Sequence, residues 1–208
     1  MSIVVPTITA NSEQYEGFIA DYIQFAPRLH LDLSDGDFSP SKTVELNEIY
    51  WPYNMTIDLH VMYKDPMPLI DEIIALYPNL VIIHAEADVD HRHFAERVKG
   101  AGIKFGVALL AETSVESVSE LSDVLDHVLI FSGNLGHYGG VVNMKLVSKV
   151  EEIKKLNPNI EISWDGGINI DNAKQLVESG IDVLNVGGYI AGAENSREAY
   201  MKLSEAIA

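Results

Sequence analysis

The sequence contains no cysteine. Disulfide bonds and thiolate zinc sites are therefore excluded, and any bound metal must be held by histidine and carboxylate side chains. Long apolar runs are also missing. None approaches the roughly 18 residues of a membrane-spanning helix, and the N-terminus has no basic segment followed by an apolar one. We expect a cytoplasmic protein that does not bind membranes.

Basic residues are scarce. The 208 residues include 14 Lys and Arg against 31 Asp and Glu, which gives a formal net charge of −17. Nucleic acids and anionic membranes need clustered basic side chains, so neither suits this chain. A small phosphorylated substrate is compatible, because backbone N–H groups at helix N-termini bind phosphate without lysine. The length and the 47% apolar content predict one domain spanning residues 1–208.

Apolar, β-branched runs alternate with amphipathic stretches along the chain. Strands are predicted at residues 3–9, 29–33, 56–62, 80–84, 104–109, 127–132, 161–165 and 182–186. Helices are predicted at residues 13–24, 66–77, 91–99, 113–124, 142–156, 169–178 and 196–207. The fourth of these begins with the spacing of a capping box, from Thr113 to Glu116. Strict alternation indicates a parallel sheet, and eight units indicate a (β/α)8 barrel.

The main alternative is an open, doubly wound sheet. That fold carries a Gly-x-Gly-x-x-Gly turn after its first strand, whereas residues 7–13 contain no glycine. The closed barrel is therefore favoured. In such barrels the chemistry takes place at the C-terminal ends of the strands.

Three predicted strands carry a histidine and an acid two residues apart. They contain His30-Leu-Asp32, Asp58-Leu-His60 and His84-Ala-Glu86, and the seventh strand ends at Asp165. Alternate residues of a strand point to the same face, so each pair directs two metal-capable side chains the same way. Taken singly, each could be a structural ion pair. Together they predict one metal site at the C-terminal end of the barrel.

Longer motifs surround these residues. They are His30-Leu-Asp-Leu-Ser-Asp-Gly-Asp-Phe-Ser-Pro40, Asp58-Leu-His-Val-Met62, His84-Ala-Glu-Ala87, Gly106-Val-Ala-Leu109, Asp165-Gly-Gly-Ile-Asn169 and Asp182-Val-Leu-Asn-Val-Gly-Gly188. In this order, over nearly the whole chain, they resemble the motifs of the ribulose-phosphate 3-epimerase family. The first is similar to His-Val-Asp-Val-Met-Asp-Gly-x-Phe-x-Pro. The last stands where the family has Ala-Asp-x-x-Val-Ala-Gly-Ser.

The resemblance implies a (β/α)8 TIM barrel of the ribulose-phosphate-binding type that holds one divalent metal ion. By motif position, the metal ligands are His30, Asp32, His60 and Asp165. Asp32 and Asp165 are also the implied catalytic pair. Two imidazoles with two carboxylates suit Zn, Fe(II), Mn or Co. The family also implies a homo-oligomer.

The implied reaction converts D-ribulose 5-phosphate to D-xylulose 5-phosphate. Two aspartates transfer the proton, through an enediolate that the metal stabilises. Asp58 is expected to orient His60 or a neighbouring group, and His84 with Glu86 is expected to form a supporting layer.

Glycine-rich turns follow the last three predicted strands, the first of them starting at Gly136. Barrels often bind phosphate there on backbone N–H groups, although such glycines could serve the turns alone. A short extra helix is expected at residues 189–192. The candidate substrate-binding residues are Thr9, His137, Gly139, Gly140, Gly166, Gly167, Gly187 and Gly188.

The chain departs from the family pattern on the walls of this site. Ser34 and Phe131 replace methionines, and Gly188 replaces a serine. The turn at residues 134–141 is one residue longer than in the family and lacks its proline and glutamine. These changes, above all the altered loop at residues 135–138, favour an alternative substrate, a hexulose 6-phosphate of the allulose 6-phosphate type.

Two further functional interpretations of the sequence stay open. One is a sugar-phosphate-binding barrel without turnover. The other is decarboxylation or aldol cleavage, as in related phosphate-binding barrels that resemble each other through an Asp-x-Lys-x-x-Asp signature. The corresponding strand here, Asp58-Leu-His-Val-Met62, has no lysine.

Overall fold

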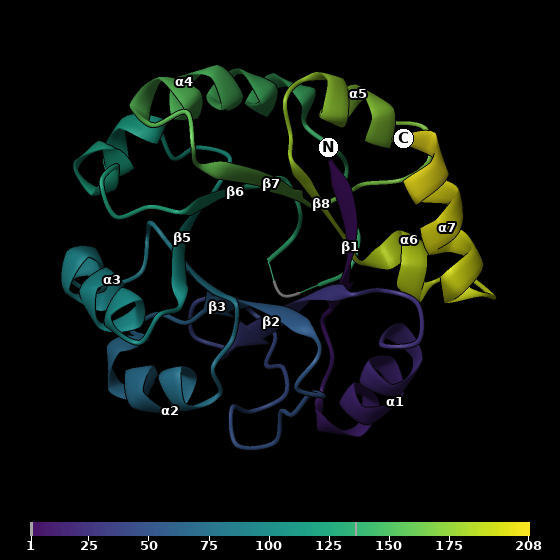
Figure 1. Ribbon diagram of the computed structural model, residues 1–208, viewed down its shortest axis with the longest axis horizontal. Helices are drawn as coiled ribbons and strands as arrows, with labels where there is room; N and C mark the ends of the chain where they lie inside the picture. The colour runs from purple at the N-terminus through teal and green to yellow at the C-terminus, as the bar shows by residue number, and fades with distance from the viewer. Residues whose placement is uncertain (1, 136) are drawn as a thin grey trace.

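A computed structural model of the chain describes residues 2–135 and 137–208, so Gly136 of the expected phosphate turn lies outside the described residues. Eight parallel strands close into a barrel in chain order, with helices around the outside (Figure 1). The strands are β1 (Ile3–Ile8), β2 (Arg28–Ser34), β3 (Thr56–Met62), β4 (Leu80–His84), β5 (Lys104–Leu109), β6 (His127–Phe131), β7 (Glu161–Asp165) and β8 (Val183–Val186). The predicted (β/α)8 barrel is confirmed.

The helices that cover the barrel are α1 (Ser12–Tyr22), α2 (Ile70–Ala75), α3 (His91–Gly100), α4 (Ser148–Leu156), α5 (Ala173–Glu178), α6 (Gly188–Ala191) and α7 (Ser196–Ala206). The described residues also form the 3₁₀ helices η1 (Met67–Leu69), η2 (Val115–Leu121) and η3 (Met144–Val147). The expected short helix after the last strand is therefore α6. No helix among the described residues is long and apolar enough to cross a membrane.

The predicted capping box at Thr113 is wrong. The segment η2 begins after Ser114, which makes no side-chain capping bond, and it is a 3₁₀ helix rather than an α-helix. The hydroxyl of Thr113 donates to the carboxylate of Glu86 instead. A charged acceptor makes the stronger hydrogen bond, so it outcompetes a backbone cap. A capping box does form at α1, between Asn11 and Gln14.

Each strand is buried on both faces, which explains its nearly continuous apolar sequence. On β2, Leu29, Leu31 and Leu33 belong to the main core cluster, while the alternate residues His30 and Asp32 lie in the barrel interior. A second apolar cluster fills the interior beside β4, β5 and β6 and consists of Leu80, Ile82, Ala108, Leu129 and Phe131. The interior on this side is thus apolar between His127 on β6 and His84 on β4, and the other buried polar side chains of the strands lie on β1–β3, β7 and β8.

A network of hydrogen bonds closes the N-terminal end of the barrel. Arg28 donates from Nε to Asp58 at 2.6 Å and from its two terminal nitrogens to Glu161 at 3.0 and 2.7 Å. His127 lies 2.9 Å from Glu161 and 2.7 Å from the hydroxyl of Ser163. These bonds tie β2, β3, β6 and β7 together across the interior.

The network also includes both carboxylate oxygens of Asp58. Its second oxygen accepts from Asn79 at 2.8 Å, while Nδ1 of His60 lies 2.9 Å from Asp32. Asp58 therefore orients Arg28 and Asn79 at the opposite end of the barrel, so of the two expected partners, His60 or a neighbouring group, it pairs with neighbouring groups.

Replacing Glu161 should weaken the fold in a pH-dependent way. Burial alone would raise its pKa, but hydrogen bonds with His127 and Arg28 outweigh burial and hold the pKa well below its usual value of 4.5. Since the ionised form stabilises the fold, its contribution is complete above about pH 5 and is lost as the pH falls towards the folded-state pKa. Glu161→Gln should lower the free energy of unfolding at neutral pH by about 1–2 kcal/mol, because solvent partly screens this carboxylate.

Urea unfolding at about pH 7 and about pH 3 measures this effect. The difference between the wild type and Glu161→Gln should narrow at the lower pH. A difference that stays constant would contradict the role of the ionised carboxylate. The exposed Glu205→Gln is the control and should change the free energy of unfolding by less than about 0.5 kcal/mol.

Candidate active site

Four side chains converge at the C-terminal end of the barrel. One ligand atom from each of His30, Asp32, His60 and Asp165 lies within 4.8 Å of the others. Nε2 of His30 is 3.3 Å from Asp32 and 3.5 Å from Asp165, and Nδ1 of His60 is 2.9 Å from Asp32. The set is the one that the sequence motifs indicated.

The strand register explains the convergence. His30 and Asp32 are alternate residues of β2, and Asp32 stands opposite His60 on β3. Asp165 is the last residue of β7, which lies on the other side of β8 and β1. Strand ends in a closed barrel point to one axis, so residues far apart in sequence meet there.

The unsatisfied polar atoms at this end fit a bound divalent cation. Both ring nitrogens of His30 and one carboxylate oxygen of Asp165 are buried without a hydrogen-bond partner among the described residues. Buried polar atoms are normally paired, so these atoms require another partner. Two nitrogen and two oxygen donors are a suitable ligand set for Zn, Fe(II), Mn or Co.

The two carboxylates have opposite electrostatic environments. Burial alone would raise the pKa of Asp32, but the imidazoles of His30 and His60 outweigh it and hold the pKa well below its usual value. Burial, together with the charge of Asp32, raises the pKa of Asp165 well above its usual value. Burial lowers the pKa of His30. The protein alone therefore moves the pKa values of the two aspartates in opposite directions, and the two titrate as a pair.

His84 and Glu86 lie behind His60. Nε2 of His84 is 2.9 Å from Nε2 of His60, and Nδ1 of His84 is 3.3 Å from Glu86. Glu86 in turn accepts hydrogen bonds from Thr113 and from the backbone N–H of Leu110. Burial lowers the pKa of His84 to about 4, although the carboxylate of Glu86 acts in the opposite direction. The ring of His84 is therefore neutral near pH 7. Such a chain can fix the ring orientation and the tautomer of His60.

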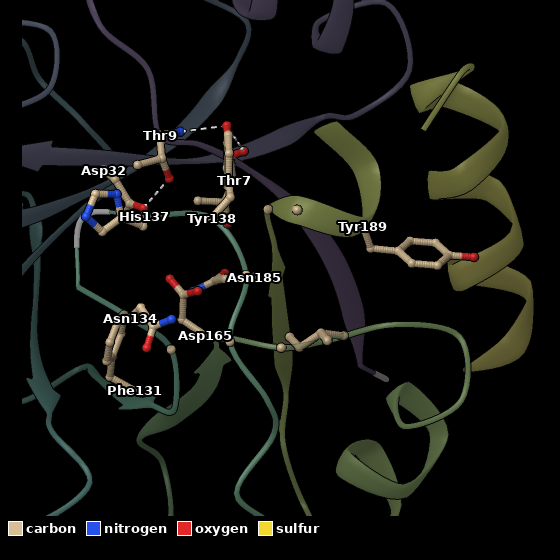
Figure 2. A pocket seen from close by; sticks show the side chains of 18 of the residues that line it. Thr7, Thr9, Asp32, Phe131, Asn134, His137, Tyr138, Asp165, Asn185 and Tyr189 are labelled. Atoms are coloured by element: carbon tan, nitrogen blue, oxygen red, sulfur yellow. Dashed lines mark hydrogen bonds between the residues drawn. The ribbon is translucent and has the colours of Figure 1, made fainter. Parts of the chain in front are cut away.

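A cavity of about 230 Å³ opens beside the four converging side chains. Both Asp32 and Asp165 line it (Figure 2). The eight candidate substrate-binding residues also line it: Thr9, His137, Gly139, Gly140, Gly166, Gly167, Gly187 and Gly188. The structure thus brings every site residue named from the described part of the sequence into one place.

The glycines of these turns let three loops interlock. Gly166 has φ +107°, and a Cβ there would lie 2.2 Å from the backbone nitrogen of Gly133 in the loop after β6. A Cβ on Gly187, after β8, would lie 2.6 Å from the ring of Tyr138. No other residue type fits without moving backbone or ring, so the three turns form one glycine-lined wall of the cavity.

Tyr138 fastens the altered loop to β1, a role that the sequence analysis missed. Its hydroxyl accepts from the backbone N–H of Thr9 at 2.9 Å and donates to the carbonyl of Thr7 at 3.3 Å (Figure 2). Thr9 donates from Oγ1 to Asp32 at 2.6 Å. The altered loop is therefore linked to the aspartate through two hydrogen bonds. An aromatic residue beside two glycines gave no indication of this partner, which is 129 residues away in sequence.

Two more polar residues of the cavity were missed, Thr7 on β1 and Asn185 on β8. Both line the cavity, and their side-chain oxygen and nitrogen atoms are buried without a partner in the described part of the chain. Asn185 could have been found from the sequence. It is the polar residue in the apolar run Val183-Leu-Asn-Val186, where the family pattern quoted above has valine.

Fold and site together define a (β/α)8-barrel enzyme with a candidate metal centre and a glycine-lined cavity at the C-terminal ends of its strands. The model of the ribulose-phosphate 3 epimerase family matches residues 3–191, and the chain belongs to this family. The predicted class, an isomerase of the racemase and epimerase type, is confirmed by this membership.

The relatives have low sequence identity to this chain, but the similarity extends over most of its length. The chain is 29% identical over 204 residues to the ribulose-phosphate 3-epimerase of Helicobacter pylori (strain J99), with 94% of each chain covered. It is 29% identical to that of Aquifex aeolicus, with 98% of this chain and 96% of the relative covered. The relative in Bacillus subtilis is 27% identical, with 84% of each covered.

Solved structures show the same fold. One is a 3-hexulose-6-phosphate synthase, with a TM-score of 0.72, 17% identity and 100% of both chains covered. Another is the phosphoribosyl anthranilate isomerase of Thermus thermophilus, with a TM-score of 0.66, 14% identity, and 100% of this chain and 98% of that chain covered. At these identities the similarity concerns the barrel alone.

The converging side chains predict one tightly bound divalent ion per chain. His60→Ala should abolish stoichiometric binding, and His84→Ala should lower the affinity about 10- to 100-fold because it removes the support of His60. Elemental analysis and calorimetric titration with Zn or Mn measure both effects. The exposed His93→Ala is the matched control. Retention of one tight ion by His60→Ala would contradict the site.

The hydrogen bonds of Tyr138 predict how the altered loop moves. Tyr138→Phe should raise backbone amide exchange in residues 133–142 up to about tenfold, because one hydroxyl ties this loop to β1. Hydrogen-exchange mass spectrometry measures the change, with the fully exposed Tyr53→Phe as the control. If the exchange of this segment is unchanged, the hydroxyl does not hold the loop.

Proposed function

We propose that the chain is a metal-dependent ketose-phosphate 3-epimerase that interconverts D-ribulose 5-phosphate and D-xylulose 5-phosphate. The observation that carries this proposal is the pair Asp32 and Asp165. The two carboxylates come from β2 and β7, face one cavity (Figure 2), and have opposite pKa shifts. Membership of the epimerase family supports the same reaction.

Epimerisation at C3 removes a proton from one face of the carbon and returns one to the other face. This requires a base and an acid on opposite sides of a flat enediolate. Asp32, whose pKa its imidazole neighbours lower, suits the base, and Asp165, whose pKa burial raises, suits the acid. For the reverse reaction the two exchange roles.

His30, Asp32, His60 and Asp165 would hold the metal. When bound, a divalent ion supplies a Lewis acid that lowers the energy of the negatively charged intermediate. The hydroxyl of Thr9, 2.6 Å from Asp32, orients that carboxylate, and the apolar ring of Phe131 limits water in the cavity. His84 and Glu86 orient His60.

The phosphate group would lie on the glycine-lined wall. Gly139, Gly140, Gly166, Gly167, Gly187 and Gly188 leave backbone atoms open to the cavity. Backbone N–H groups can bind an anion without a basic side chain, which suits a chain of net charge −17. His137 also lines the cavity and could donate to the substrate.

A hexulose 6-phosphate of the allulose 6-phosphate type is the alternative substrate, and the altered loop favours it. Tyr138, His137 and the neighbouring glycines form the side of the cavity that would meet the longer sugar. Decarboxylation or aldol cleavage is disfavoured, since the part of the cavity wall that the structure describes includes no lysine. A binding protein without turnover would not need two aspartates with opposite pKa shifts.

The remaining expectations concern the location, the oligomeric state and the substrate class of the protein. We propose that it acts in the cytoplasm as a homo-oligomer on a small phosphorylated ketose. Analytical ultracentrifugation of the metal-loaded protein would measure the oligomeric state.

Deuterium exchange tests the proposed reaction. In D₂O, metal-loaded protein should introduce deuterium at C3 of ribulose 5-phosphate and accumulate xylulose 5-phosphate, as NMR would show. Asp165→Asn should lower the rate about 100- to 10,000-fold, because an amide cannot supply the proton. The exposed Asp171→Asn is the control and should keep the wild-type rate.

The other outcomes are equally informative. Exchange only with a six-carbon ketose phosphate would keep the chemistry and change the substrate. Normal turnover by Asp165→Asn, or turnover that survives complete removal of metal, would contradict the mechanism. The absence of exchange with every ketose phosphate would favour the binding protein.

A further inference from the structure

Asn185 is a buried amide at the side of the cavity. Its side chain is 2% exposed, and neither its oxygen nor its nitrogen has a hydrogen-bond partner among residues 2–135 and 137–208. An unpaired buried amide destabilises a protein, so one that lines a cavity indicates a ligand group that pairs with it.

The position of Asn185 specifies which part of a ligand it meets. On one side, Asn185 is the register partner of Asp165 on the neighbouring strand β7, and the two side chains lie together in Figure 2. On the other side, Gly187 follows two residues later, just after β8 ends, and also lines the cavity, on the glycine-lined wall. Asn185 thus lies between the proposed acid and the proposed phosphate site.

A linear substrate that spans these two sites must pass Asn185. In a pentulose 5-phosphate, C3 reacts and C5 carries the phosphate, so the group between them is the hydroxyl on C4. A hydroxyl both donates and accepts hydrogen bonds, and a primary amide offers both complements. Valine, which the family pattern has at this position, offers neither.

We propose that Asn185 is a specificity-determining residue that hydrogen-bonds the substrate hydroxyl on the carbon between the reacting carbon and the phosphate-bearing end. This inference deepens the proposed function and depends on it for the orientation of the substrate. It adds a polar contact that neither the metal ligands nor the glycine turns provide.

The test measures binding without turnover. Ribitol 5-phosphate has no carbonyl and cannot be epimerised, and its 4-deoxy analogue lacks only the hydroxyl in question. Calorimetry on metal-loaded protein would compare the wild type with Asn185→Val and Asn185→Thr, whose side chains are close in shape and differ by one hydroxyl. The wild type should bind ribitol 5-phosphate about tenfold more tightly than the deoxy analogue.

The affinities of the variants for the two probes should follow the ability of residue 185 to form hydrogen bonds. Asn185→Val should bind both probes with the weak affinity that the wild type has for the deoxy analogue, and Asn185→Thr should recover part of the discrimination. If Asn185→Val discriminates as the wild type does, the inference is wrong.

Thermal unfolding separates a binding role from a structural one. Without ligand, Asn185→Val should melt at the same temperature as the wild type or higher, because valine leaves no amide unpaired. A melting temperature several degrees lower, with discrimination between the probes unchanged, would mean that Asn185 supports the fold and would overturn the inference.

The outcomes for the two proposals are distinct. If the wild type binds ribitol 5-phosphate but exchanges no deuterium with any ketose phosphate, the proposed reaction fails, and the comparison of variants still decides the role of Asn185. If the wild type binds neither the ketose phosphates nor ribitol 5-phosphate, both proposals fail.

Discussion

Two carboxylates are buried within a few ångströms of each other at the mouth of this barrel, where water is scarce and like charges repel strongly. Neither Asp32 nor Asp165 can be ionised there at low cost without neighbouring groups that stabilise the charge. The imidazoles of His30 and His60 lower the pKa of Asp32, and Asp165 is left with a raised pKa and an unpaired oxygen. The neighbouring contacts follow from this constraint, since Thr9 satisfies one oxygen of Asp32 and His84 fixes the ring of His60.

Buried polar groups are paired at the N-terminal end of the barrel, whereas several at the C-terminal end keep unpaired atoms. At the N-terminal end, Arg28, Asp58, Glu161 and His127 pair with one another or with nearby amide and hydroxyl groups. At the C-terminal end, His30, Asp165 and Asn185 keep unpaired atoms. A satisfied network rigidifies the scaffold, whereas unpaired donors and acceptors beside a cavity are what a ligand can use. This contrast distinguishes polar groups that stabilise the fold from polar groups that are available to a ligand, and it does not depend on comparison with relatives.

The fold and the convergence of the histidines and acids were predictable from local periodicity, whereas the family resemblance singled out the four candidate ligands. Alternation along β2 places His30 and Asp32 on one face, and parallel strands in sequence order bring His60 beside them. The partners of Tyr138 and Asp58 were not predictable, because each depends on contacts between strands and loops that no local pattern encodes. The 3₁₀ form of η2 was missed for a related reason, since the hydroxyl of Thr113 is taken by Glu86, 27 residues away in sequence.

The departures from the family pattern lie on one side of the site. The four converging side chains keep their motif identities, while the loop after β6 and the wall at Asn185 differ. In the proposed reaction, proton abstraction would depend on the first group, and recognition of substrate length and hydroxyl groups on the second, so the chemistry could be conserved while the substrate changes. Asn185 sharpens this argument. Its amide has no partner among the described residues and a valine would leave no amide unpaired, so the proposed hydrogen bond with substrate would explain an asparagine at this position.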